Sequence, residues 1–264
     1  MRFMSSRLLH RAVTVASRAA QRAGALQVAS SGRPKSVRIK SSAVDLVTDV
    51  DRASERLLHR EITRHFPGHG FQGEERTRTH PDAPFQWIVD PLDGTMNFVH
   101  GVPVFAISIG LQHRGRTVAG VIYDPNRREL FTAIQGEGAR LNGRRIRVAP
   151  TRRLAQGLLS TGFPPNFREG KTAYLRWFRA FELQSHGVRR IGSTAVSLAY
   201  VACGRHEGFY EQELWPWDIA AGLLLVEEAG GRVSDFQGRP VRLERGEVVA
   251  SNGLLHGQML VLLR

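Results

Sequence analysis

The sequence predicts an α+β fold, of the mixed α/β class, and three observations support this prediction. Apolar residues recur at the 3.6-residue period of a helix, first within residues 9–23. Residues 105–142 show instead short apolar strands separated by turn residues. From residue 154 onward, short apolar strands alternate with helical segments, which is the rhythm of α/β architecture.

The first predicted helix carries its apolar residues on one face and its arginines on the others, as expected of an amphipathic helix. Residues 30–42 follow as a basic loop or strand pair. Thr48 is the predicted N-cap of a second helix, which Pro67 and Gly68 end. The apolar face of the first helix consists of Leu9, Ala12, Val13, Ala16, Ala19, Ala20 and Ala23.

Strands dominate the middle of the chain and helices return after it. Residues 87–89 form a predicted buried strand, and the pair Asn142-Gly143 is a strong signal for a hairpin turn. The later helices are predicted at residues 173–181, 193–202, 218–228 and 254–263. We expect one compact unit over residues 1–264, with approximate halves 1–150 and 151–264.

The charge is concentrated at the N-terminus. Residues 1–44 hold nine of the 37 Arg and Lys residues and none of the 24 Asp and Glu, so the other 220 residues carry only +4. Such a basic arm suits RNA, an acidic protein or a membrane surface, and it also resembles a transit peptide. The stronger interpretation is a structural helix with solvated arginines.

Two further features bound the class of protein. No apolar run reaches the roughly 20 residues of a membrane span, so we expect no membrane insertion. Cys203 is the single cysteine, which excludes an intramolecular disulfide and fits a cytoplasmic protein. Its apolar neighbours indicate a buried, unreactive thiol.

The most informative segment is residues 87–98, WIVDPLDGTMNF, where two acids three residues apart follow an apolar strand. Pro91 is predicted to end the strand, because proline has no N–H for the ladder. Asp90 and Asp93 then lie at one strand end, where two buried carboxylates need a cation to offset their repulsion. Mg²⁺ prefers such carboxylate oxygens, so the segment predicts a magnesium site.

A phosphate site is predicted next to it. Gly94 permits a tight turn, and Thr95 is a candidate N-cap for a following helix. The backbone N–H groups around Gly94 and Thr95 can then bind an anion. A magnesium site facing a phosphate site is the equipment of phosphoryl transfer.

Further motifs occur in a fixed order along the chain. They are DLVTDVD at 45–51, GEE at 73–75, LNG at 141–143, GSTAV at 192–196, WDIAAG at 217–222 and EAGG at 228–231. Together with residues 87–98, this set resembles the inositol monophosphatase family of Mg²⁺-dependent, lithium-sensitive phosphomonoesterases. The resemblance runs from about Leu8 onward and implies a layered αβαβα sandwich of the sugar-phosphatase type.

The resemblance also implies a ligand set for two to three Mg²⁺ ions. The metal ligands would be Glu74, Asp90, the Leu92 carbonyl, Asp93 and Asp218. Glu75 is then an outer or surface acid. Taken alone, Asp218 could instead be a first-turn acid that favours a helix dipole.

The implied catalytic group consists of Glu74, Thr95 and Asp51. Asp51 orients Thr95, and this pair with the glutamate activates a metal-bound water for direct attack on phosphorus, without a phosphoenzyme. Considered by itself, Asp51 could simply close a capping pair with Thr48.

The implied substrate contacts fall into two groups. Asp93, Gly94, Thr95 and Asp218 would lie on the phosphate side. The alcohol side would consist of Gly192, Ser193, Thr194 and Glu211, although Ser193 could equally be only a helix N-cap.

The sequence departs from common family versions at residues 211–215, EQELW. Glu213 and Trp215 stand where the family often has smaller residues, so they could narrow the pocket mouth or change its preference. Strict inositol specificity is therefore in doubt.

Three functions remain as hypotheses. The first is hydrolysis of myo-inositol 1-phosphate, or a similar polyol phosphate, by a homodimer of the family type. The second is the same chemistry on fructose 1,6-bisphosphate or a broad set of sugar phosphates, for which the sequence places no second basic contact. The third is RNA or transcription-complex binding through the basic N-terminal segment.

Overall fold

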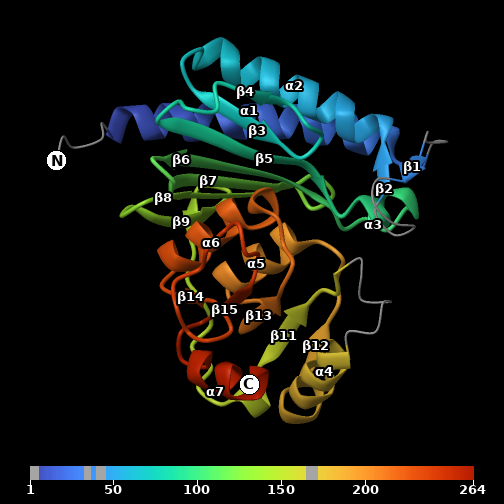
Figure 1. The fold of residues 1–264 in the computed structure, drawn as a ribbon, viewed down its shortest axis with the longest axis vertical. Helices are drawn as coiled ribbons and strands as arrows, with labels where there is room; N and C mark the ends of the chain where they lie inside the picture. Colours follow the sequence, from blue (N-terminus) through green and yellow to red (C-terminus); the bar gives the residue numbers. More distant parts are fainter. Residues whose placement is uncertain (1–5, 33–36, 40–45, 165–171) are drawn as a thin grey trace.

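The structure is a computed structural model, and it describes residues 6–32, 37–39, 46–164 and 172–264. Five layers follow one another from top to bottom in Figure 1: two helices, a sheet, two helices, a second sheet and two more helices. The predicted mixed α+β class and layered αβαβα sandwich are confirmed. Of the predicted basic arm, Arg2, Arg33, Lys35 and Lys40 lie outside the described residues.

The outer layer consists of α1 (Ser6–Ser30) and α2 (Asp49–His65). α1 buries an alanine-rich face against α2 and the first sheet, which permits close approach of the backbones. Thr48 caps α2 as predicted, because its hydroxyl accepts from the N–H groups of Val50 and Asp51. β1 (Val37–Ile39) pairs antiparallel with β2 (Leu46–Thr48), which leads into α2. β1 lies within the predicted basic segment 30–42, whereas its partner β2 follows that segment.

The first sheet has eight strands in the order β10-β9-β8-β7-β6-β5-β3-β4, and its neighbours are antiparallel except for the parallel pair β3 and β5. The predicted hairpin at Asn142-Gly143 is present, with both residues at positive φ. The strands are β3 (Gly70–Gly73), β4 (Arg78–Thr79), β5 (Phe85–Asp93), β6 (Ala106–His113), β7 (Arg116–Asp124), β8 (Glu129–Ile134), β9 (Gly138–Leu141) and β10 (Arg144–Arg145).

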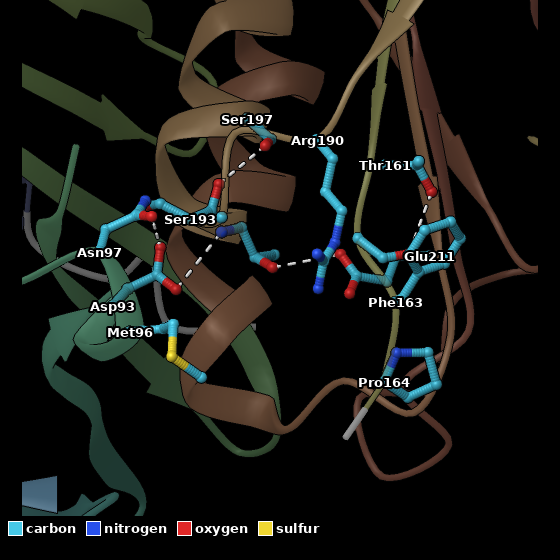
Figure 2. Close-up of a pocket in the computed structure, with 13 residues that line it drawn as sticks. Asp93, Met96, Asn97, Thr161, Phe163, Pro164, Arg190, Ser193, Ser197 and Glu211 are labelled. Carbon is cyan, nitrogen blue, oxygen red and sulfur yellow. Dashed lines mark hydrogen bonds between the residues drawn. The ribbon is translucent and has the colours of Figure 1, made fainter. Parts of the chain in front are cut away.

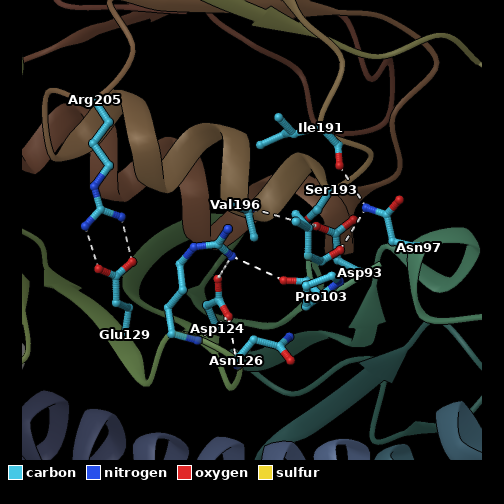
Figure 3. Close-up of polar contacts among 12 residues, drawn as sticks. Asp93, Asn97, Pro103, Asp124, Asn126, Glu129, Ile191, Ser193, Val196 and Arg205 are labelled. Atoms are coloured by element: carbon cyan, nitrogen blue, oxygen red, sulfur yellow. Dashed lines mark hydrogen bonds and ion pairs between the residues drawn. The ribbon is translucent and has the colours of Figure 1, made fainter. Parts of the chain in front are cut away.

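Helices α5 (Thr194–Ala202) and α6 (Pro216–Glu228) lie between the two sheets and are almost wholly buried. Their all-round apolar character follows from this position, since each meets protein on both sides. An ion pair between Arg205, which follows α5, and Glu129 of β8 joins this helix layer to the first sheet, with one hydrogen bond of 2.6 Å (Figure 3).

The second sheet has five strands in the order β12-β11-β13-β15-β14, with β11 parallel to both β12 and β13. The helices α4 (Thr172–Gln184) and α7 (His256–Leu263) cover its outer face, and a short 3₁₀ helix, η1 (Leu154–Gln156), precedes it. The strands are β11 (Leu158–Thr161), β12 (Gly187–Arg189), β13 (Gly208–Glu211), β14 (Arg232–Ser234) and β15 (Val248–Ser251).

Within the described residues, no helix has both the length and the apolar character needed to cross a bilayer. Cys203 is half-buried at the end of α5, and burial raises the pKa of its thiol, in keeping with the predicted unreactive role.

Candidate active site

The prediction that Pro91 ends its strand is wrong. β5 continues to Asp93, and its pairing with β6 shifts register between Asp90 and Asp93. The proline therefore lies in a β-bulge, where an absent N–H costs no ladder hydrogen bond. The bulge keeps the backbone extended while bringing the two acids to the end of one strand. Within it, the Leu92 N–H donates to Asp90 Oδ1 at 2.8 Å.

The prediction that Thr95 is an N-cap is also wrong. Gly94 is the N-cap of the short helix α3 (Thr95–Val99), and it makes no side-chain capping bond. Its φ of 96° and its surroundings both favour glycine, because a Cβ here would lie 2.9 Å from the Val104 carbonyl oxygen and 3.1 Å from that of Gly192. The turn that exposes the first N–H groups of α3 thus depends on this glycine.

Asp51 combines the two roles that the sequence left open. It closes a capping box with Thr48, accepting from its backbone N–H at 2.9 Å and from its hydroxyl. Its other oxygen, Oδ1, accepts a hydrogen bond from the Thr95 hydroxyl at 3.0 Å. Burial raises the pKa of the fully buried Asp51 carboxyl, against the hydrogen bonds from Thr48 that lower it. The Thr95 hydroxyl also lies 3.1 Å from the Leu92 carbonyl oxygen.

Asp93 reaches across to the start of α5 (Figure 3). Its Oδ2 accepts from the Ser193 hydroxyl and from the Ala195 N–H at 2.7 Å, and its Oδ1 accepts from the Thr194 N–H at 3.3 Å. Ser193 is also the N-cap of α5, accepting from the Val196 N–H. The N-cap role that the sequence allowed for Ser193 is thus confirmed, and its contact with substrate stays a prediction.

The other two acids come from separate segments. Glu74 follows β3, and its N–H donates to the Val89 carbonyl of β5 at 3.1 Å, so it lies beside the strand that carries Asp90. Asp218 is in the first turn of α6 and accepts from the Trp215 N–H at 2.7 Å. Asp218 is thus the first-turn acid that the sequence allowed, and it also caps the helix through the Trp215 N–H.

The acids act strongly on one another. Burial is the largest cause that raises the pKa of Asp90 well above its usual range, followed by repulsion from Glu74, Asp93 and Asp218. Burial and the charges of Glu74 and Asp93 likewise raise the pKa of Asp218. Burial raises the pKa of Asp93 to about 6, although the hydrogen bonds from Ser193, Ala195 and Thr194 oppose it. The structure thus brings all four predicted acids into one electrostatic cluster.

A cavity of about 720 Å³ opens beside Asp93 and extends to the end of β13 (Figure 2). Glu211 ends β13 there, and the Thr194 hydroxyl lies 3.4 Å from its carboxylate. Burial, together with the charge of Asp93, raises the pKa of Glu211 to about 8. The lining residues are Asp93, Met96, Asn97, Thr161, Gly162, Phe163, Pro164, Arg190, Gly192, Ser193, Thr194, Ser197 and Glu211.

Comparison with known proteins decides the family. The family model described as the inositol monophosphatase family matches residues 9–264. The chain belongs to the inositol monophosphatase family.

Relatives within this family carry two kinds of name. The chain is 46% identical over 217 residues to an inositol-1-monophosphatase of Mesorhizobium japonicum, covering 82% of each chain. It is 45% identical over 248 residues to the Nus factor SuhB of Pseudomonas aeruginosa, covering 91% of each. Among solved structures, the extragenic suppressor protein suhB of Bartonella henselae matches with a TM-score of 0.91 and 41% identity, over 95% of this chain and 97% of that one. The family supports a phosphatase that acts on phosphorylated substrates.

Inositol monophosphatases are generally Mg²⁺-dependent, and the donor set of this chain fits that ion. Four carboxylates and the Leu92 carbonyl would offer it hard oxygen ligands, and a bound cation would relieve the repulsion among the carboxylates. In the part of the chain that the structure describes, no three His, Cys, Asp or Glu side chains are arranged to hold a metal ion as they stand.

Several cavity residues were not predicted from the sequence. Arg190 follows β12, and its guanidinium carbon lies 5.2 Å from the centre of the Phe163 ring, which follows β11 (Figure 2). Asn97 joins the two sides of the site by donating to the carbonyls of Val104 and Ile191, both at 2.8 Å (Figure 3). Arg190 and Phe163 follow the carboxyl ends of neighbouring parallel strands, which is the position where α/β folds place ligands.

The unusual residues of the 211–215 segment lie outside the lining of this cavity. Trp215 is 62% exposed and stacks on Trp217 with ring centres 5.3 Å apart and an angle of 9°. Glu213 adopts a φ of 62°, which is uncommon for a residue with a side chain. Their effect on specificity stays a prediction.

Proposed function

We propose that this protein hydrolyses the phosphate monoester of a polyol, with myo-inositol 1-phosphate as its substrate and myo-inositol and phosphate as products. The observation that carries the proposal is the meeting of four acids from three segments with the Asp51–Thr95 pair, beside a cavity of about 720 Å³. The ions would be held by Glu74, Asp90, the Leu92 carbonyl, Asp93 and Asp218. When bound, Mg²⁺ supplies charge neutralisation and lowers the pKa of water at the site.

The residues of the chain itself would hold and orient the reactants. Asp51 accepts the Thr95 proton, which leaves the Thr95 oxygen free to accept a proton from the attacking water, with Glu74 as the second acceptor nearby. The N–H groups of Gly94 and Thr95, at the start of α3, suit the phosphate oxygens. Water would then attack phosphorus directly, and the leaving oxygen would depart toward the cavity.

The leaving group would bind among Gly192, Ser193, Thr194 and Glu211. Thr194 and Glu211 lie within reach of one another and offer a hydroxyl and a carboxyl group to substrate hydroxyls. The depth of this pocket depends on Gly162, since a Cβ there would meet the Glu211 carboxylate at 2.1 Å. A polyol suits this lining because each of its hydroxyls both donates and accepts.

Arg190 favours a second candidate substrate, fructose 1,6-bisphosphate. The sequence placed no basic contact for a second phosphate, whereas the structure places the exposed Arg190 side chain in the cavity lining. An Arg190→Gln variant tests this candidate. If a second phosphate binds there, KM for the bisphosphate rises while KM for myo-inositol 1-phosphate stays unchanged.

The deciding experiment is phosphate release from myo-inositol 1-phosphate, fructose 1,6-bisphosphate, histidinol phosphate and phosphoadenosine phosphate, with and without Mg²⁺ and lithium. Mg²⁺-dependent, lithium-inhibited release that is fastest with myo-inositol 1-phosphate supports the proposal. Faster release from another compound would identify that compound as the better substrate and would still support Mg²⁺-dependent phosphate hydrolysis. No release from any of them contradicts an enzymatic role.

Two further parts of the proposal rest on the family and the composition. We propose a homodimer, which light scattering of the purified chain tests directly. We also propose a cytoplasmic location, supported by the single cysteine and tested by fractionation of cells that express the protein. A role in a transcription complex is suggested by the relatives named Nus factor.

A further inference from the structure

The outer helix α2 carries a regular row of arginines. Arg52, Arg56, Arg60 and Arg64 are spaced four residues apart along its 17 residues, and we call them the α2 arginine stripe. At 1.5 Å of rise per residue, successive members are about 6 Å apart along the axis, so the stripe extends about 18 Å. Each step also advances about 40° around the helix, because four residues exceed one turn.

The stripe faces away from the protein. The buried side of α2 consists of residues such as Ser54, Leu58 and Ile62, while Arg56, Arg60 and Arg64 are exposed and Arg52 is half-buried. α2 lies at the outer edge of the molecule, at the top of Figure 1, and the catalytic cavity lies elsewhere, between β5 and the second sheet. The phosphatase chemistry therefore makes no use of the stripe.

Of the described acids of α2, Glu61 forms an ion pair with one member of the stripe, and Asp49 is exposed at the start of the helix without an ion pair to the stripe. Asp51 and Glu55 are buried, and Glu55 accepts hydrogen bonds from the N–H groups of Glu75 and Thr77. Glu61 pairs with Arg22 of α1 at 2.8 Å and lies 3.7 Å from Arg60. With the described acids, the stripe members Arg52, Arg56 and Arg64 form no ion pair.

Such an arrangement disfavours the isolated helix. Like charges four residues apart repel one another on a helix surface, and the stripe contains three such pairs. A polyanion that binds along the stripe removes this repulsion. The electrostatic energy of the stripe is therefore lower with a chain of negative charges bound along it than with water alone.

A hollow of about 220 Å³ continues the stripe at the start of α2. Arg38 of β1 lines it together with Arg52 and Arg56, and Asp49 is the acid in its lining. Three arginines from two elements therefore line one hollow on the surface. Guanidinium groups bind phosphate oxygens through paired hydrogen bonds.

We propose that the α2 arginine stripe, with Arg38, binds the phosphodiester backbone of a single strand of nucleic acid. A nucleic acid strand offers one charge per nucleotide at a regular interval, as the stripe does along its axis. A membrane surface is a poorer match, because no large apolar side chain among the exposed ones belongs to α2. The contacts are to phosphates, so the binding is independent of base sequence.

The test uses the full chain and a fluorescein-labelled single-stranded RNA of 20 nucleotides, with fluorescence anisotropy measured between 50 and 200 mM salt. Each phosphate contact on a single strand contributes about −0.7 to the slope of log K against log salt, so four or five contacts give a slope near −3. The variant R52Q/R56Q/R60Q/R64Q is expected to lose most of that slope and to weaken Kd at 50 mM salt at least tenfold. Its thermal midpoint is expected to stay level or rise, because the repelling pairs are gone.

The matched control is R144Q/R152Q/R176Q/R179Q, which removes the same charge from exposed positions away from α2. This control keeps the slope, and so does the charge-conserving variant R52K/R56K/R60K/R64K. Should the quadruple glutamine variant unfold, R56Q/R64Q replaces it and is expected to lose about half of the slope. The proposal is overturned if both quadruple glutamine variants weaken binding equally, or if binding follows the deletion of residues 1–5 instead of the stripe. It is also overturned if polyglutamate or phosphatidylserine vesicles displace the RNA as well as unlabelled RNA does.

Discussion

The contact between Asp51 and Thr95 leads to a prediction about how the two residues divide their work. Thr95→Val removes the hydroxyl while keeping the shape of the side chain. Proton transfer by a positioned side chain contributes about 10²- to 10⁴-fold, so kcat for phosphate release is expected to fall by that factor, or about 2.7 to 5.4 kcal/mol in barrier height. Thr95→Ser keeps the hydroxyl and is expected to stay within about tenfold of the original rate.

Stability follows a different course from activity. Thr95→Val leaves the fully buried Asp51 Oδ1 without its partner at 3.0 Å, which costs about 1–3 kcal/mol of unfolding free energy. Asp51→Asn also disturbs the capping box with Thr48, where loss of a cap typically costs about 1 kcal/mol. Both costs are measured by urea unfolding, and rates are compared below each variant's unfolding transition.

The double variant decides whether Asp51 acts through Thr95. If it does, D51N/T95V is no slower than Thr95→Val alone, because the interaction has already been removed. The assay is phosphate release from myo-inositol 1-phosphate at saturating Mg²⁺ and substrate. Rate losses that multiply in the double variant would refute this reasoning and give Asp51 an independent role.

Three other substitutions test the site and the core. Asp93→Asn is expected to lower the rate of phosphate release at least about a hundredfold, and near-normal turnover contradicts the ligand assignment. It is also expected to reduce the rise in thermal midpoint on adding Mg²⁺. For the unsubstituted protein, Mg²⁺ at 100 times its Kd adds about 2.7 kcal/mol to the free energy of unfolding. Gly94→Ala places a Cβ in the left-handed region, at a cost of about 1–2 kcal/mol, and close to two carbonyl oxygens. Calorimetry should therefore show a lower thermal midpoint, and the phosphate-release assay a lower kcat. An unchanged kcat would show that catalysis does not depend on this turn. Burial lowers the pKa of the fully buried His256 to about 4, so between pH 6.5 and 4 the unfolded chain binds the extra proton and stability falls as pH falls, by about 2 kcal/mol at pH 5. His256→Gln should remove that part of the difference between urea unfolding at pH 7.5 and pH 5; an unchanged difference contradicts the neutral buried state.

The sequence was sufficient to predict the fold class and the four acids that the structure brings together, while the role of these acids as metal ligands stays a prediction. Helical and strand periods are set by which side chains must face a core, and the order of the acidic motifs carries over from the family. Pro91 was mispredicted because a missing N–H excludes proline from a regular ladder, but not from a bulge. The register shift that creates the bulge depends on pairing with β6, which no local pattern reveals.

The cavity residues also depend on tertiary structure that local sequence patterns do not reveal. Phe163 and Arg190 are 27 positions apart in the chain, and neither has a periodic or motif signal. They meet because β11 and β12 are parallel neighbours whose carboxyl ends share one edge of the second sheet. The order of strands in a sheet is a tertiary property, so residues that follow those strands could not be assigned to a site in advance.

Asp93 has a consequence for how the site responds to its ions. The carboxylate assigned to Mg²⁺ is the same one that holds the first turn of α5 through Ser193 and Ala195. If Asp93 binds Mg²⁺ as proposed, binding of the cation would be linked to the position of Thr194 relative to Glu211, and such linkage is reciprocal. A polyol bound against α5 would then change the affinity for magnesium by the same factor by which magnesium changes the affinity for the polyol.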